Sequence, residues 1–200
     1  MRQQFNKLII NIVIFLTLIS SIMGCGGDDD ELVIVDNYLP IEVGNFWTFI
    51  LPEYLDGPAT IAITGTTKLS SGKTVLVAKV TYDKEVAKLG YLSRADDDLL
   101  LFHQAVRDLQ GELIYRPPIK VGTTWRGDSG EAEVVAKETV NAPAGTFKDC
   151  FQVNVRSVDD RNDSYYAIWL AKNVGPVKIA QFDEDWKIER IALLDRSNAR

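Results

Sequence analysis

The chain has 200 residues, of which 22 are basic and 28 acidic, and its net charge is −6. This length suits one ordinary domain, and an acidic chain without a basic cluster argues against nucleic acid as a partner. With only two cysteines, the chain cannot be built on a disulfide framework.

The N-terminal segment has the layout of a secretory signal. Arg2 and Lys7 form a basic start, and residues 8–23 are sixteen mostly apolar residues that end near small ones. A permanent membrane span is the alternative, but it needs about 20 apolar residues. The apolar stretch is shorter and is interrupted by Asn11 and Thr17. We therefore interpret residues 1–24 as a signal peptide that is cleaved.

The sequence Ile-Met-Gly-Cys at residues 22–25 resembles the bacterial lipobox. The resemblance implies cleavage between Gly24 and Cys25, diacylglycerol on the Cys25 sulfur, and a further acyl chain, such as palmitate, on the new N-terminus. Two acyl chains hold a protein stably on a membrane. The alternative is an ordinary cleavage with a free cysteine nearby.

Residues 25–37 read as the lipidated cysteine followed by an acidic tether, because Gly-Gly-Asp-Asp-Asp-Glu at residues 26–31 has no apolar side chain. Retention in the inner membrane of Gram-negative bacteria is associated with aspartate after the lipidated cysteine. Gly26 occupies that position, so the outer membrane is expected if the host has one. Residues 1–24 hold two basic residues and no acid, so residues 25–200 carry a net charge of −8. Such a domain does not dock electrostatically on anionic lipid, and the membrane contact is expected through the anchor alone.

Residues 38–200 are predicted to form one β-domain, because short alternating or aromatic-rich segments recur between turn signals. Phe151, Val153 and Val155, for example, alternate with polar residues, and the Pro143–Gly145 triplet predicts a tight turn. Strands are expected at residues 45–51, 60–67, 73–82, 88–94, 98–104, 111–117, 131–142, 146–158, 164–171, 176–182 and 186–194, with a further one after Trp125. The fold class is therefore all-β, an antiparallel meander of about 11–12 strands that forms a sandwich, a barrel or an open half-barrel.

Two segments of eight residues are similar in sequence. Pro-Ile-Glu-Val-Gly-Asn-Phe-Trp at residues 40–47 (the first octet) and Pro-Ile-Lys-Val-Gly-Thr-Thr-Trp at residues 118–125 (the second octet) agree at five positions. We interpret this as two related β-meanders, residues 38–116 and 117–194. The alternative is a coincidence between two strand starts.

Three patches resemble a loose group of bacterial envelope lipoproteins of unknown function. They are residues 38–49, the Pro-Ala-Gly-Thr-Phe hairpin within residues 140–155, and residues 165–179. The resemblance implies an envelope location and a β-rich fold, and it supplies no catalytic residues. The chain departs from the pattern at Ala171-Lys172-Asn173, where a proline or alanine with a glycine is expected before Val174, so the sequence leaves the conformation of this turn uncertain.

The catalytic alternatives are weak. His103 is the single histidine, so a protease triad with Asp108 and the Gly-Asp-Ser-Gly at residues 127–130 would have to use it. Chymotrypsin-like proteases distribute the triad residues over two barrels and a much longer chain. A hairpin turn explains residues 127–130 without a catalytic role. We predict no enzyme activity and no cofactor.

Three short acidic stretches, at residues 95–98, 159–163 and 183–185, could offer oxygen ligands to calcium. We interpret them as solvated hairpin turns and predict no metal site. Cys150, within a predicted strand, is interpreted as a small buried or half-buried side chain.

The sequence therefore predicts a lipid-anchored, non-enzymatic envelope lipoprotein with a binding, scaffold or surface role, and an envelope protein is a possible partner. The alternative function is a carrier or chaperone that holds an apolar or lipid ligand in a β half-barrel. The 46% hydrophobic content and the aromatic residues around Trp47, Trp125, Tyr166 and Trp169 favour this alternative.

Overall fold

The computed structural model describes residues 37–51, 57–82, 85–95, 98–102, 112–127, 130–159, 162–183, 185 and 187–199. These residues form twelve strands: β1 (Phe46–Ile50), β2 (Ala59–Lys68), β3 (Thr74–Tyr82), β4 (Glu85–Ala95), β5 (Asp98–Phe102), β6 (Glu112–Tyr115), β7 (Thr124–Gly127), β8 (Gly130–Ala142), β9 (Gly145–Asp159), β10 (Asn162–Ala171), β11 (Gly175–Phe182) and β12 (Ile188–Ser197). No helix occurs in this described part, and hence none there that could cross a membrane.

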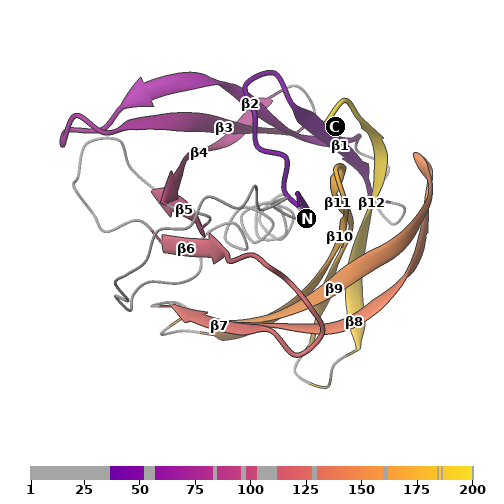
Figure 1. The fold of residues 1–200 in the computed structure, drawn as a ribbon. Helices are drawn as coiled ribbons and strands as arrows, with labels where there is room; N and C mark the ends of the chain where they lie inside the picture. The colour runs from indigo at the N-terminus through magenta and orange to yellow at the C-terminus, as the bar shows by residue number, and fades with distance from the viewer. Residues whose placement is uncertain are drawn as a thin grey trace, which may run out of the picture.

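All twelve strands belong to one curved sheet in the order β6-β5-β4-β3-β2-β1-β12-β11-β10-β9-β8-β7 (Figure 1). Every neighbouring pair is antiparallel, and the first and last strands of the chain, β1 and β12, pair in the middle of the sheet. The edges are β6 and β7, which are consecutive in the chain. The predicted all-β class and the antiparallel meander of 11–12 strands are confirmed, in the form of an open curved sheet.

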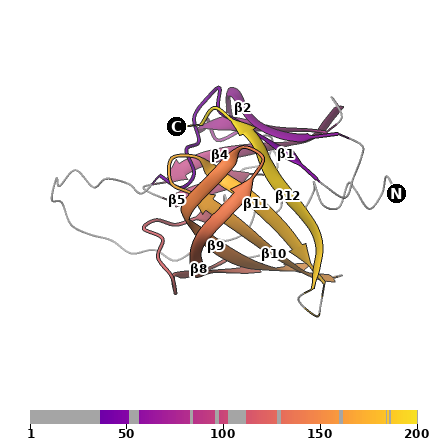
Figure 2. The ribbon, with the colours of Figure 1, turned by 90° about the vertical axis from the view of Figure 1, so that its right-hand side faces the viewer.

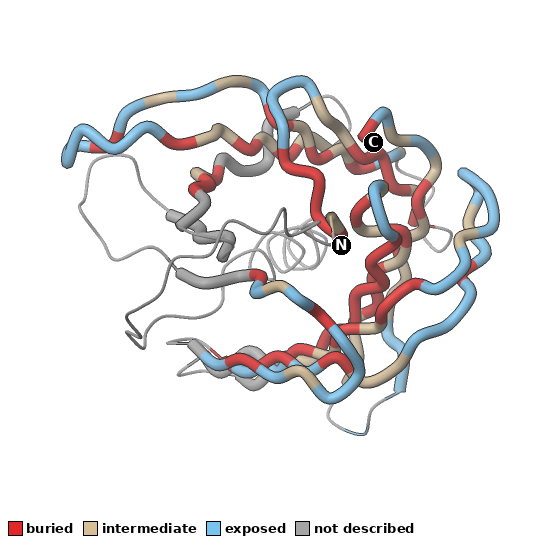
Figure 3. The backbone as a smooth tube through the Cα atoms, in the orientation of Figure 1, coloured by how far each residue is buried: buried red, intermediate tan, exposed pale blue. Residues whose placement is uncertain are grey.

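One face of the sheet is a continuous apolar surface. Paired residues of neighbouring strands lie on the same face, and the row Val134, Val153, Ile168, Ile179 and Ala192 crosses five strands from β8 to β12 with every member buried. The surface continues onto β1 and beyond, and the tube in Figure 3 shows how buried positions recur along the curved sheet. Removing each valine or isoleucine side chain of this row from water stabilises the fold by about 1.5–3 kcal/mol.

The hairpin of β8 and β9 extends beyond β10 and reaches back to β12, as the crossing ribbons in Figure 2 show. At its tip, the backbone N–H of Ala144 donates to the carbonyl of Leu194 at 2.9 Å. On the face opposite the apolar row, Trp169 of β10 donates its indole N–H to Glu138 of β8 and lies under the ammonium group of Lys178 at 3.9 Å. Both faces of β10 are therefore covered, and residues 166–171 are all buried.

Candidate functional site

The two octets fold into the same turn. The backbone N–H of Gly44 donates to the carbonyl of Ile63, and that of Gly122 donates to the carbonyl of Val134, both at 2.8 Å. Gly44 has a φ of 96° and Gly122 a φ of 88°, a region that side chains with a Cβ rarely adopt. The shared glycine of the octets therefore has a conformational cause in each half.

The strands after each octet pair in the same register. The matching pairs of β1·β2 and β7·β8 are Phe46–Ala62 and Thr124–Glu133, Trp47–Ile61 and Trp125–Ala132, Thr48–Thr60 and Arg126–Glu131, and Phe49–Ala59 and Gly127–Gly130. The next pairing repeats as well, because both registers shift at the same place, between Ile63 and Gly65 in β2 and between Val134 and Ala136 in β8. The two halves thus share a turn, three strands and an irregularity, although the domain limits at residues 116/117 stay a prediction.

The halves differ at the outer side of the first strand. In the first half, β12 covers the edge of β1, and its last residues complete the hydrogen bonds. The backbone N–H of Phe46 donates to Oδ1 of Asn198 at 2.9 Å, while Ser197 donates its hydroxyl to the Phe46 carbonyl at 2.8 Å. Asn198 also donates its amide N–H to the carbonyl of Gly44 at 3.0 Å.

In the second half, the corresponding edge of β7 is open as far as the described residues show. The carbonyl of Thr123 accepts from Val134 of β8, and alternate residues of an antiparallel strand bond to the same neighbour. The N–H and C=O groups of Thr124 and Arg126 therefore point away from β8. Within the described ranges, β7 has β8 as a partner strand on one side and no strand on the other.

Beside this open edge lies a hollow of about 650 Å³ over β7, β8 and β9. Six of its lining residues share the face opposite Trp125, namely Thr124, Arg126, Glu131, Glu133, Asn154 and Arg156; the other three are Trp125, Ala132 and Val155. The guanidinium of Arg126 and the carboxylate of Glu131 form an exposed ion pair at 3.1 Å. At the matching place in the first half, the hydroxyls of Thr48 and Thr60 share a hydrogen bond of 3.1 Å.

The tryptophan of the first octet, Trp47, contacts the turn between β10 and β11. The Trp47 indole donates to the carbonyl of Val174 at 2.5 Å, in the turn between β10 and β11. The chain can approach this closely because Gly175 has no side chain: a Cβ there would lie 2.7 Å from Nε1 of Trp47. In this turn Asn173, with a φ of 61°, and Gly175, with a φ of 96°, supply the left-handed positions that the sequence left uncertain.

Several residues singled out from sequence lie outside the described residues. They include Gly24 and Cys25 at the expected cleavage and lipidation site, together with His103 and Asp108. Gly127 and Gly130 pair across the end of the β7·β8 hairpin, as expected if residues 127–130 form a turn. The prediction of no enzyme activity remains untested.

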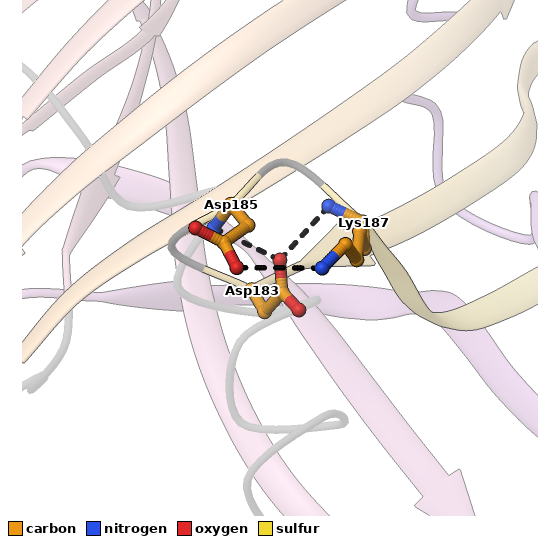
Figure 4. Close-up of polar contacts among 3 residues, drawn as sticks. All are labelled: Asp183, Asp185 and Lys187. Atoms are coloured by element: carbon orange, nitrogen blue, oxygen red, sulfur yellow. Dashed lines mark hydrogen bonds and ion pairs between the residues drawn. The ribbon is translucent and has the colours of Figure 1, made fainter.

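The acidic turn between β11 and β12 has a local structural use (Figure 4). Oδ1 of Asp183 accepts the backbone N–H groups of Asp185 at 3.0 Å and Lys187 at 2.8 Å. The Lys187 ammonium lies 3.4 Å from the Asp185 carboxylate. No group of three or more potential metal-ligating side chains occurs within the described ranges.

Cys150 is fully buried, which agrees with its interpretation as a small buried or half-buried side chain of a strand. Burial raises the pKa of its thiol from 9.0 to about 11, with smaller contributions from the carboxylates of Glu138 and Asp149, while a backbone hydrogen bond from Val140 opposes the shift. Its place in the register corresponds to that of Val75 in the first half, which is also buried. The thiol thus fills a packing position and is held in its protonated, unreactive form.

Sequence reasoning missed Ser197 and Asn198, which finish the edge of β1. Their contacts join residues more than 150 positions apart, so no local pattern indicates them. It also missed the open edge of β7, because alternation along a strand does not say whether one edge or both edges are paired.

Comparison with solved structures shows the fold. A putative exported protein with a YmcC-like fold from Bacteroides fragilis superposes with a TM-score of 0.52 at 20% identity, over 80% of this chain and 97% of that one. A putative lipoprotein from Parabacteroides distasonis superposes with a TM-score of 0.51 at 15% identity, over 80% and 98%. No known family and no curated protein matches the sequence. At these identities the likeness concerns the fold alone.

Proposed function

We propose that the protein is a lipid-anchored envelope lipoprotein without enzyme activity, whose β-domain binds or scaffolds another envelope component. The observation that carries this proposal is the Ile-Met-Gly-Cys sequence at residues 22–25 behind a basic start and an apolar stretch. The fold likeness to a putative exported protein and a putative lipoprotein supports it.

The start of the described domain is compatible with a tether. Asn37 accepts a backbone hydrogen bond of 2.6 Å from Asn173, and the ring of Tyr38 packs edge-on against Phe151 at 5.0 Å, so the domain begins at a firmly packed place. From Cys25 to Asn37 the chain can extend at most about 40 Å. A domain on such a tether stays close to the bilayer. Gly26 after the cysteine supports placement in the outer membrane of a Gram-negative host.

A binding or scaffold role is supported because several of the described polar side chains have structural roles. Asp183 closes a turn, Asn198 and Ser197 complete a strand edge, and Cys150 is buried with a raised pKa. What the domain offers to a partner is the open edge of β7 and the hollow beside it.

The anchor is tested by expressing the full chain in a Gram-negative host with a labelled fatty acid. We expect label on the wild-type protein, loss of residues 1–24, and partition into the detergent phase. The Cys25→Ser variant should carry no label, whereas Cys150→Ser is the matched control and should be labelled like the wild type. An unlabelled wild-type protein, or one that keeps residues 1–24, contradicts the proposal.

The second candidate function is a carrier of an apolar ligand with a polar group. Its specific support is Gln181, whose Oε1 is buried and accepts no hydrogen bond within the described part of the chain. Gln181 pairs with Tyr166 and lies on the same face as the buried Ile179, so the acceptor borders the apolar face of the sheet. A buried acceptor without a donor is costly, and a ligand O–H or N–H would satisfy it.

Native mass spectrometry of the gently purified protein distinguishes this candidate. A carrier retains a lipid-sized mass, and Gln181→Leu lowers the retained fraction while keeping the fold. A protein that elutes without a ligand from a lipid-rich extract contradicts the carrier function.

A further inference from the structure

The edge of β1 has hydrogen-bond partners that the described residues do not provide at the edge of β7. β12 lies against β1, and its last residue, Ser197, donates its hydroxyl to the carbonyl of Phe46. Asn198, directly after β12, bridges the N–H of Phe46 and the carbonyl of Gly44 with its side-chain amide. Thr124 and Gly122 occupy the matching positions in the second half, by the shared turn and the shared register. Their outward groups have the same spacing and direction, but no strand lies against them in the described part of the chain.

We propose that the open edge of β7 binds an extended segment of a partner protein, which adds to the sheet as an antiparallel strand. Such an edge recognises main-chain groups, and a side-chain hollow beside it adds specificity. The 650 Å³ hollow over β7, β8 and β9 provides the second element. A polypeptide fits this edge because the same chain fills the equivalent edge with a strand of its own.

The paired edge also indicates the side chains of the segment. By analogy with Ser197 and Asn198, a serine and an asparagine at its end would meet the Thr124 carbonyl, the Thr124 N–H and the Gly122 carbonyl. One position of the segment must differ from β12. In the first half, Arg196 of β12 pairs with Thr48 of β1, and Arg126 of β7 occupies the position of Thr48 in the second half. Like charges directly opposite on neighbouring strands repel. The segment therefore carries an acidic residue where β12 carries Arg196.

The chain's own β6 does not match this template. It spans four residues against ten in β12, and it lies at the opposite end of the sheet order from β7. Closure of the sheet by β6 is thus an outcome that the experiment must separate from binding of a partner.

This inference rests on the proposed binding role and is independent of the lipid anchor, so a negative acyl-labelling result and a negative binding result are distinguishable. The test uses the full chain in detergent and two synthetic peptides. One has the sequence of residues 188–199, and the other differs from it only by Arg196→Glu. We expect the Glu peptide to bind two- to fivefold more tightly than the Arg peptide, roughly the range for one cross-strand charge pair. The Arg126→Glu variant should reverse this preference.

Backbone recognition is tested at Thr124. Thr124→Pro removes the outward N–H at a place where an edge strand tolerates proline, and we expect about tenfold weaker binding of the Glu peptide. Thr124→Ala keeps this N–H and should bind the Glu peptide more tightly than Thr124→Pro does. Because Thr124→Pro could disturb the strand, the charge reversal at Arg126 provides an independent measurement.

Amide hydrogen exchange gives the third readout. In the free protein, the amides of Thr124 and Arg126 should exchange fast and those of Phe46 and Thr48 slowly, and the Glu peptide should slow the first two. Slow exchange at Thr124 in the free protein would mean that the edge is already closed, and this overturns the proposal. Absence of binding of either peptide up to about 1 mM, or equal affinity of Thr124→Pro and Thr124→Ala, overturns it as well.

Discussion

The two halves of the sheet start alike and end differently. Each opens with a Pro-Ile-x-Val-Gly turn, a tryptophan strand and an irregular second strand in the same register. The first half then has its edge covered by β12, and its tryptophan is bonded to the turn between β10 and β11. In the second half no described strand covers the corresponding edge, and an exposed ion pair stands where the first half has two bonded threonines.

A repeated strand pattern therefore does not ensure that both copies are packed against other elements of the chain. In the first half the turn at Gly175 and the end of β12 lie against the octet, and Thr48 is buried to 2% exposure. At the matching position in the second half, the Arg126 side chain is 78% exposed. The matching positions are therefore packed in the first half and solvated in the second.

The largest effect is expected from Gly175→Ala, which would break the junction of the first half. The added Cβ would stand 2.7 Å from Trp47, at a φ of 96°. Backbone strain and overpacking together should lower the free energy of unfolding by about 3–4 kcal/mol. Gly72→Ala is the matched control, because its φ is 85° and the space around it is open. It should cost about 1–2 kcal/mol in urea unfolding, and equal losses for the two variants would contradict the close approach to Trp47.

The next largest effect is a pH dependence at Cys150. Because the thiol pKa is raised to about 11 in the folded protein, the folded state keeps its proton where the unfolded thiol has lost it. This contribution is fully present below pH 9.0 and is lost as the pH rises through about 11, on the order of 2 kcal/mol in total. Cys150→Val, which copies the residue at the matching place in the first half, should remove this dependence. Parallel stability curves for variant and wild type between pH 8 and 11 would count against the shift.

The two octet tryptophans should contribute differently to the free energy of unfolding. Trp47→Phe loses the hydrogen bond to Val174 and leaves that carbonyl without its donor, which should cost about 1–3 kcal/mol. Trp125→Phe should cost less, under about 1 kcal/mol, because no hydrogen bond of its indole appears within the described ranges. Urea unfolding of the two variants tests this order, and the reverse order would show that the second octet is the better packed one.

The smallest effect is expected from Arg126→Ala. Its ion pair with Glu131 is exposed, so the free energy of unfolding should change by less than about 0.5 kcal/mol. Thr48→Val at the matching place should cost about 1 kcal/mol, because it removes a hydrogen bond at a buried position. A loss above 1 kcal/mol for Arg126→Ala would mean that the two faces are equally covered.

Much of the fold could be predicted from sequence because its causes are local. Phe151, Val153 and Val155 alternate with polar residues and lie in β9, and Pro143 and Ala144 form the two-residue turn before it. The lipidation site at Cys25 stays a prediction from sequence, because it lies outside the described residues. The candidate binding edge could not be predicted, since it depends on which strand lies next to β7.

By itself, the sequence determined the strands, their turns and the repeated octet, because alternation and left-handed glycines act over a few neighbouring residues. Only the tertiary structure decided that β1 and β12 meet in the middle of the sheet while β6 and β7 stay apart. That choice depends on contacts such as Asn198 with Phe46, which pair groups 152 residues apart in the chain. Strand edges are satisfied by main-chain hydrogen bonds that any sequence can make, so the pattern of side chains cannot reveal which edge is left open.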